Sequence, residues 1–247
     1  MKILFTSDPH GDIEAIKKFS KLLKHYDCGI IAGDILDEFI PISDAISFGL
    51  RSEDYIEELF DAEDDEVMKL QDSIDDALHN PQSVNRIGLE MKKDLIMSIL
   101  NEAKKPIFYI TGNHDIAEWG NRGFMINVEN TKVCFKNYSF VGFSSTNFDT
   151  SEEEEQKQLK AIEPLIDKRT IFITHSPPYG ILDLTERNDK IGSTLLLDVI
   201  KKRKPFMNLF GHVHESFGRQ GIFFNSSWFG NNKFMSINTT FKTMKLI

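Results

Sequence analysis

The chain has 247 residues, of which 40% are hydrophobic and 27% are charged, and its formal net charge at pH 7 is −9. This length and this apolar content suffice for one domain with a complete hydrophobic core, so the composition predicts a folded globular protein rather than a disordered one. The acidic balance disfavours a broad surface for the phosphate backbone of nucleic acids, because such a surface needs clustered lysine and arginine.

Short apolar runs alternate with amphipathic segments from the first residues onward, and this alternation is typical of α/β architecture. Residues 2–8 (KILFTSD) predict a first strand, and residues 28–34 (CGIIAGD) predict a second, buried strand. Between them, residues 12–26 carry apolar side chains at helical spacing, and Asp12 is a suitable N-cap for a helix there.

The span from about residue 37 to residue 105 departs from this alternation, because it contains no convincing strand and is far longer than a usual crossover. Its apolar residues recur every three or four positions, which predicts two or three helices, the main pair joined near Asn80 and Pro81. The span holds 18 acidic and seven basic residues, a net charge of −11, so the rest of the chain carries +2. We expect this acidic helical insertion to form a solvated cap over a site or a contact between two subunits.

Strands and helices alternate again after the insertion. The predicted elements are a strand at 106–115 (PIFYITGNHD), a hairpin at 131–144 that turns at Lys136 and Asn137, a helix at 151–166 with Ser151 as its cap, a strand at 170–178 (TIFITHSPP), a helix at 193–202, a strand at 204–214 (KPFMNLFGHVH), and short β-hairpins from Ile222 onward. A sheet with helices on its faces would bring the ends of these strands together.

Five of the predicted strands end in Asp, Asn or His. These residues are Asp8 and His10, Asp34, Asn113 and His114, His175, and His212 and His214. Taken singly, each is as well explained as a turn or capping residue. The carboxyl ends of strands in α/β sheets border the ligand crevice, however, so all of them are predicted to converge.

The donor set of these strand ends is carboxylate, amide oxygen and imidazole, with no thiolate. Such donors suit Mn, Fe, Co, Ni or Zn, and their number is enough for two ions about 3.5–4 Å apart that share one carboxylate. Two divalent ions, two aspartates and one hydroxide sum to about +1, which attracts a phosphate anion, and metal-bound water has a pKa of about 7.

The ordered blocks SDPHGD, AGD, GNHD, TH and GHVH resemble the motif pattern of the calcineurin-like metallophosphoesterases, over a stretch from Asp8 to His214. The resemblance implies a fold of the α/β (α+β) class, a two-sheet β-sandwich flanked by helices on both faces, with the acidic helical insertion following the second strand. It also implies a single domain over residues 1–247.

The resemblance further implies a role for each residue of the motifs. Asp8, His10 and His214 would bind a first metal ion, Asn113, His175 and His212 a second, and Asp34 would bridge them. His114 would not bind metal but would donate a hydrogen bond or a proton to the phosphate ester, and Asp115 would orient its imidazole. The expected cofactors are two divalent ions, with Mn²⁺ preferred and Fe, Zn, Co or Ni as alternatives.

The expected activity is hydrolysis of a small phosphodiester or phosphomonoester by a hydroxide that bridges two metal ions. A nuclease acting on DNA or RNA is one alternative, which the acidic insertion and the absence of a basic stripe disfavour. A non-catalytic scaffold on the same fold is another, which the complete ligand set disfavours. A homodimer formed through the insertion is an open expectation.

Two further features bear on location and on substrate. The apolar run before Asp8 is too short for a signal peptide, and no stretch approaches the roughly 20 apolar residues of a membrane span, so we expect a cytoplasmic protein. Cys28 and Cys134 have no metal-binding or redox spacing, so we expect both thiols to be reduced. Many bacterial members of the family continue with an NPGS-like turn, whereas this chain has NSSWFG at 225–230. This departure bears on substrate recognition more than on chemistry.

Overall fold

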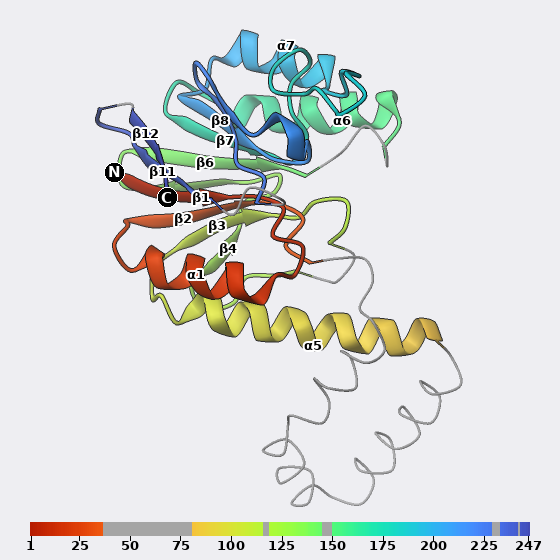
Figure 1. Ribbon diagram of the computed structural model, residues 1–247. Helices are drawn as coiled ribbons and strands as arrows, with labels where there is room; N and C mark the ends of the chain where they lie inside the picture. Colours follow the sequence, from red (N-terminus) through yellow and green to blue (C-terminus); the bar gives the residue numbers. More distant parts are fainter. Residues whose placement is uncertain (37–80, 116–118, 145–149, 229–232, 242) are drawn as a thin grey trace, which may run out of the picture.

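The computed structural model describes residues 1–36, 81–115, 119–144, 150–228, 233–241 and 243–247. These residues form two six-stranded sheets packed face to face, with helices on both outer faces (Figure 1). The predicted two-sheet sandwich is therefore confirmed.

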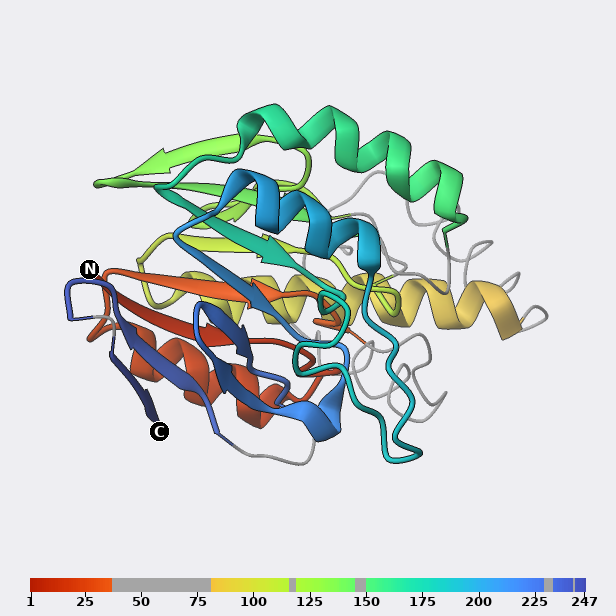
Figure 2. The ribbon, with the colours of Figure 1, turned by 90° about the horizontal axis from the view of Figure 1, so that it is seen from above.

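The first sheet has the order β12-β11-β1-β2-β3-β4, formed by Thr243–Leu246, Met235–Asn238, Lys2–Thr6, Cys28–Ala32, Ile107–Ile110 and Met125–Asn127. The second has the order β5-β6-β7-β8-β10-β9, formed by Lys132–Phe135, Tyr138–Phe143, Thr170–Thr174, Met207–Phe210, Phe223–Asn225 and Gly218–Gln220. Strands β1, β2 and β3 are parallel to one another, as are β6, β7 and β8. Their carboxyl ends meet at one edge of the sandwich, which Figure 2 shows from above.

Helices α1 (Ile13–Leu23) and α5 (Pro81–Asn101) cover the first sheet, and α6 (Glu152–Ile162) and α7 (Thr194–Arg203) cover the second (Figure 1). Helix α1 starts as its sequence predicts, because the Asp12 carboxylate accepts a hydrogen bond from the Ala15 N–H at 2.9 Å. Its buried face includes Ile16, Phe19 and Leu23, which pack on the outer face of the sheet with the apolar side of α5.

The core between the sheets is made by the inward side chains of both. Phe108 of β3 and Phe140 of β6 stack with their ring centroids 3.9 Å apart, and Ile30, Ile171 and Leu209 surround them with no exposed surface. Burial of each such side chain stabilises the fold by about 1.5–3 kcal/mol. This core fixes the edge where the strand ends meet.

Most of the predicted elements match strands or helices of the structure, and the β5–β6 hairpin turns at Lys136, which has φ 53°. The C-terminal prediction was wrong in part: β10 pairs with β9, which precedes Ile222, whereas β11 and β12 form a hairpin in the other sheet. The three-residue strands β4 and β9 were not predicted.

The acidic insertion is described only in its second half. Helix α5 begins at Pro81, the predicted joint of the main helix pair. Residues 37–80 lie outside the described part of the chain, so the cap and the subunit contact stay predictions. Among the described residues, no helix combines the length and the apolar character that crossing a bilayer requires.

Candidate metal centre

Two groups of potential metal ligands lie at the edge where the parallel strands end. The first group is Asp8, His10 and His214, and the second group is Asp34, His175 and His212. Within each group the potential ligand atoms lie within 4.8 Å of one another. Residues far apart in sequence are thus brought together by the ends of β1, β2, β7 and β8.

In the first group, the ring nitrogens of the two histidines and the carboxylate of Asp8 lie close together. The His10 Nε2 lies 3.4 Å from the His214 Nε2, and the latter lies 3.6 Å from the Asp8 Oδ1. Two imidazole nitrogens and a carboxylate oxygen that face each other so closely form a suitable ligand set for one divalent ion.

The second group has the same character, and Asn113 joins it. The His175 Nε2 lies 3.3 Å from the Asp34 Oδ2 and 3.0 Å from the Asn113 Oδ1. The His175 Nδ1 lies 2.8 Å from the Ala32 carbonyl oxygen, which only accepts, so Nδ1 carries the proton and donates it there. In the neutral ring the Nε2 lone pair is thereby directed to the site, an arrangement typical of metal-binding histidines.

Asp34 lies between the two groups. Its Oδ2 is 3.3 Å from the His175 Nε2 of the second group and 3.9 Å from the His10 Nε2 of the first. The Asp34 carboxylate, to which the resemblance gives a bridging role, thus lies within 3.9 Å of an imidazole nitrogen of each group.

The backbone at the site adopts conformations that L-residues usually avoid. Asp8, His10, Asp34 and His212 have φ values of 54°, 45°, 50° and 67°. Each such residue costs about 1–3 kcal/mol and persists only where other contacts fix it. The His10 N–H donates to the Asp34 carbonyl oxygen at 3.0 Å, and the His212 N–H donates to both Asp8 carboxylate oxygens at 3.0 and 3.1 Å.

Two motif glycines allow these loops to approach one another. A Cβ at Gly211 would collide with the side chains of Ser7 and Asp8, and a Cβ at Gly112 would collide with the Asp34 carboxylate. Gly211 therefore lets the backbone come close to Ser7 and Asp8. Gly112 does not have positive φ, but it begins the turn through Asn113 and His114, where its carbonyl oxygen accepts from the Asp115 N–H at 3.4 Å, and its lack of a Cβ allows the close approach of Asp34.

The two carboxylates are fully buried, with Asp8 0% and Asp34 1% exposed. Burial alone would raise the pKa of both, but neighbouring imidazoles outweigh it, so the pKa of Asp8 and that of Asp34 are lowered. Burial likewise lowers the pKa of His175, but Asp34 and Asp8 outweigh this and raise it to about 9, whereas burial and then His175 lower the pKa of His212 to about 4. Two buried carboxylates that raise the pKa of an adjacent histidine create a negative environment, which is the environment expected of a cation-binding site.

His114 lies at the exposed side of the centre. Its side chain is 36% exposed, its ring centroid is 5.1 Å from that of His10, and its Nε2 is 3.9 Å from the Asp34 Oδ2. Its backbone N–H donates to the Asp34 Oδ1 at 2.9 Å. The imidazole therefore neighbours the first group without belonging to either group.

Asp115 does not have the contact expected of a residue that orients His114. Its carboxylate accepts hydrogen bonds from the backbone N–H groups of Ile35 at 3.1 Å, Leu36 at 2.8 Å and Gly112 at 2.9 Å. Burial, and then the charge of Asp34, raise its pKa to about 7. Asp115 thus ties together the loops that carry Asp34 and Asn113, and we correct its predicted role accordingly.

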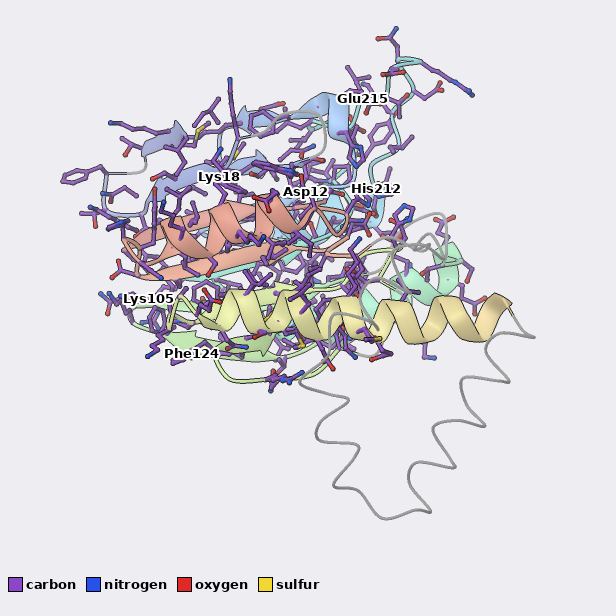
Figure 3. All side chains as sticks on the ribbon, turned by 60° about the horizontal axis from the view of Figure 1, so that its bottom comes forward. Asp12, Lys18, Lys105, Phe124, His212 and Glu215 are labelled. Atoms are coloured by element: carbon purple, nitrogen blue, oxygen red, sulfur yellow. The ribbon has the colours of Figure 1, made fainter. Side chains whose placement is uncertain are left out.

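The strand predicted at residues 204–214 does not extend as far as His212 and His214. Strand β8 ends at Phe210, His212 has positive φ, and His214 begins the short 3-10 helix η2 (His214–Ser216). The two histidines still separate as the resemblance implied, His212 in the second group and His214 in the first. Figure 3 shows His212 and Glu215 toward the same end of the molecule as Asp12, which caps α1.

Sequence reasoning missed two buried residues beside the centre, Ser7 and Asn225, each 0% exposed. The Ser7 hydroxyl donates to the Ala32 carbonyl oxygen at 2.8 Å, the same oxygen that receives the His175 Nδ1–H. The Asn225 side chain donates to the Val213 carbonyl oxygen at 2.8 Å, between the two histidines. The only sequence signal for Asn225 was the Asn that NSSWFG shares with the NPGS-like turn.

Comparison with known proteins gives one family. The family model described as calcineurin-like phosphoesterase matches residues 1–216. A curated human protein, metallophosphoesterase domain-containing protein 1, is 40% identical over 50 residues, which span 19% of this chain and 15% of the human protein. The match thus covers a small part of that relative.

Solved structures share the fold over nearly the whole chain. The protein TT1561 of Thermus thermophilus superposes with a TM-score of 0.59 at 17% identity, covering 100% of this chain and 97% of that one. A dimetal phosphatase from Danio rerio superposes with a TM-score of 0.57 at 11% identity, covering 96% and 91%. At these identities the likeness concerns the fold alone.

Proposed function

The chain belongs to the calcineurin-like phosphoesterase family, and we propose that it hydrolyses a small phosphomonoester or phosphodiester with the help of two divalent metal ions. One observation carries the proposal: two groups of buried and half-buried ligands share the edge where the strands end, the Asp34 carboxylate of the second group lies 3.9 Å from the His10 Nε2 of the first, and the half-buried His114 lies beside them. The fold of the dimetal phosphatase from Danio rerio supports the same activity.

The donor chemistry of the site supports two ions. Asp8, His10 and His214 would hold one, His175, His212 and Asn113 the other, and Asp34 both. Carboxylate, imidazole and amide oxygen are suitable ligands for Mn²⁺, which we propose as the ion bound. The same donors also suit Fe, Zn, Co and Ni. Two such ions, if bound there, would lower the pKa of bound water to about 7 and would polarise the phosphoryl oxygens of the substrate.

The chain's own residues contribute orientation and proton transfer. The Ala32 carbonyl oxygen holds the His175 ring through Nδ1, and the Asp8 carboxylate holds the His212 backbone, so both ligands are oriented before any ion arrives. The half-buried His114 imidazole donates a hydrogen bond to a phosphoryl oxygen or a proton to the leaving oxygen. Because Asn113 is neutral, the site keeps more positive charge for the substrate anion than a third carboxylate would leave.

The test is an assay of the purified chain with Mn²⁺ on bis(p-nitrophenyl) phosphate and on p-nitrophenyl phosphate, combined with metal analysis. We expect hydrolysis of at least one ester and about two ions per chain. No hydrolysis of either ester, together with less than about one bound ion, would overturn the proposal. Cleavage of DNA or RNA at physiological salt would replace it with a nuclease activity.

A further inference from the structure

A buried four-residue segment, Asn225–Trp228, crosses between the two sheets at the metal centre. We call this segment the strap. Asn225 ends β10 in the second sheet, where it is paired with Phe210, and Ser227 forms an isolated bridge with Ser7 beyond the end of β1 in the first sheet. All four strap residues are 7% exposed or less.

The first end of the strap holds the loop that carries His214. The Asn225 Nδ2 donates to the Val213 carbonyl oxygen at 2.8 Å, and the Asn225 Oδ1 accepts from the Ser227 N–H at 3.1 Å. The Val213 carbonyl belongs to the peptide unit that joins Val213 to His214. Fixing this peptide plane fixes the direction in which the chain enters His214.

The second end of the strap holds the loop that carries Asp8 and His10. The Ser7 N–H donates to the Ser226 carbonyl oxygen at 2.9 Å, and the Trp228 N–H donates to the Ser7 carbonyl oxygen at 2.7 Å. The Trp228 indole N–H donates to the Asp12 Oδ2 at 3.1 Å. The strap therefore binds this loop on both sides of the two ligands.

The ligands of the second group have other supports. The His175 ring is held by the Ala32 carbonyl oxygen, and the loops of Asp34 and Asn113 are tied by Asp115. The His212 backbone N–H is held by the Asp8 carboxylate. The strap thus supports the two loops that carry the first group.

We propose that Asn225 is a positioning residue for the metal ion of the first group, through its hydrogen bond to the Val213 carbonyl oxygen. This inference rests on the proposed function, because it presumes that the two groups bind ions. It assigns the NSSW sequence a role in holding the metal centre.

Asn225→Asp tests the inference, because the carboxylate still accepts from the Ser227 N–H but no longer donates to Val213. The variant is combined with His212→Ala, which leaves the first group intact, and separately with His10→Ala, which leaves the second group intact. Mn²⁺ affinity is measured by titration calorimetry in each pair. We expect Asn225→Asp to lower the Mn²⁺ affinity of the first group by about 10- to 100-fold and to leave the Mn²⁺ affinity of the second group unchanged.

Asn208→Asp is the matched control. Asn208 is also 0% exposed, and its Nδ2 donates to the Phe172 carbonyl oxygen at 3.1 Å and to the Thr174 Oγ1 at 3.2 Å, within the same sheet. It should cost similar stability and leave both ions in place. If Asn225→Asp does not fold, Asn225→Ser removes the same donor without burying a charge.

The outcomes separate the inference from the proposed function. A wild-type chain that binds less than about one ion overturns the proposed function. The inference alone is overturned if the wild-type chain binds two ions but Asn225→Asp changes their affinities equally in both groups. It is also overturned if Asn225→Asp changes neither affinity. Equal loss in Asn208→Asp also overturns it, because the effect would then be one of general stability.

Discussion

In the first half of the metal centre, the loops that carry Asp8 and His214 are joined by neutral groups of the strap, whereas in the second half the loops that carry Asp34 and Asn113 are joined by the buried carboxylate of Asp115. The strap's own groups in this support carry no charge, although its Trp228 indole donates to the Asp12 carboxylate. The charged support places a further carboxyl group near Asp34, and its pKa is raised to about 7 by burial and by Asp34. Similar donor sets are thus held by different physical means.

The largest expected effect comes from the residue that both halves share. Asp34→Ala removes an oxygen 3.3 Å from the His175 Nε2 and 3.9 Å from the His10 Nε2. We expect turnover to fall by about 1,000-fold or more, equal to ~4 kcal/mol of transition-state stabilisation, with loss of at least one ion. Initial rates on p-nitrophenyl phosphate and metal analysis measure both.

Asp183→Asn is the control for this variant. Asp183 is 1% exposed and accepts from the Gly180 N–H at 2.7 Å and the Gly192 N–H at 3.2 Å, but it belongs to neither ligand group. It should keep its ions and its activity. A fully active Asp34→Ala would contradict the shared role of Asp34.

His114→Ala separates turnover from metal binding in both halves. The His114 backbone N–H, which the substitution keeps, still donates to the Asp34 Oδ1, so both groups should retain their ions. The lost imidazole should lower kcat by about 100-fold or more. Metal analysis and kcat are compared with those of His25→Ala, an exposed histidine far from the motifs, which should match the wild type. Loss of one ion would show that His114 is a ligand.

Asp115→Asn mirrors the Asn225 experiment in the second half. An amide at this position cannot accept from all three N–H groups of Ile35, Leu36 and Gly112, because one of its two polar atoms is itself a donor. We expect the ion of the second group to bind about 10- to 100-fold more weakly, and that of the first group to be unaffected. The His10→Ala and His212→Ala backgrounds, titrated with Mn²⁺, give the two affinities, and equal weakening would remove the distinction between the halves.

Sequence reasoning predicted that these side chains converge because each motif follows a recognisable apolar strand and parallel strands end at a common edge, whereas their division into two ligand groups came from the family resemblance. It misassigned Asp115, whose partners Ile35 and Leu36 lie 80 and 79 positions earlier in sequence. It gave Asn225 no role toward the site for the same reason, since nothing local indicates that its side chain reaches Val213. Supports that depend on tertiary approach leave no periodic trace, whereas strands and caps do.

The smallest expected effect lies at the opposite edge of the sandwich, where Asp27 joins the two sheets. Its carboxylate accepts from the Lys136 ammonium at 2.5 Å and from the Lys2 N–H at 2.7 Å, and these bonds lower its pKa below the ordinary 3.8. Because the pair is partly exposed, Asp27→Asn should cost about 1 kcal/mol of unfolding free energy or less. Both ions should bind as in the wild type.

The pH dependence gives this prediction its sign. A carboxylate whose pKa is lowered by folding stabilises the protein above its unfolded pKa, and that contribution disappears as the pH falls through the lowered value. The difference between Asp27→Asn and the wild type should therefore be full at neutral pH and vanish in acid, as measured by urea unfolding. A larger cost, or a loss of either ion, would mean that the far edge of the sandwich sets the spacing of the two halves of the centre.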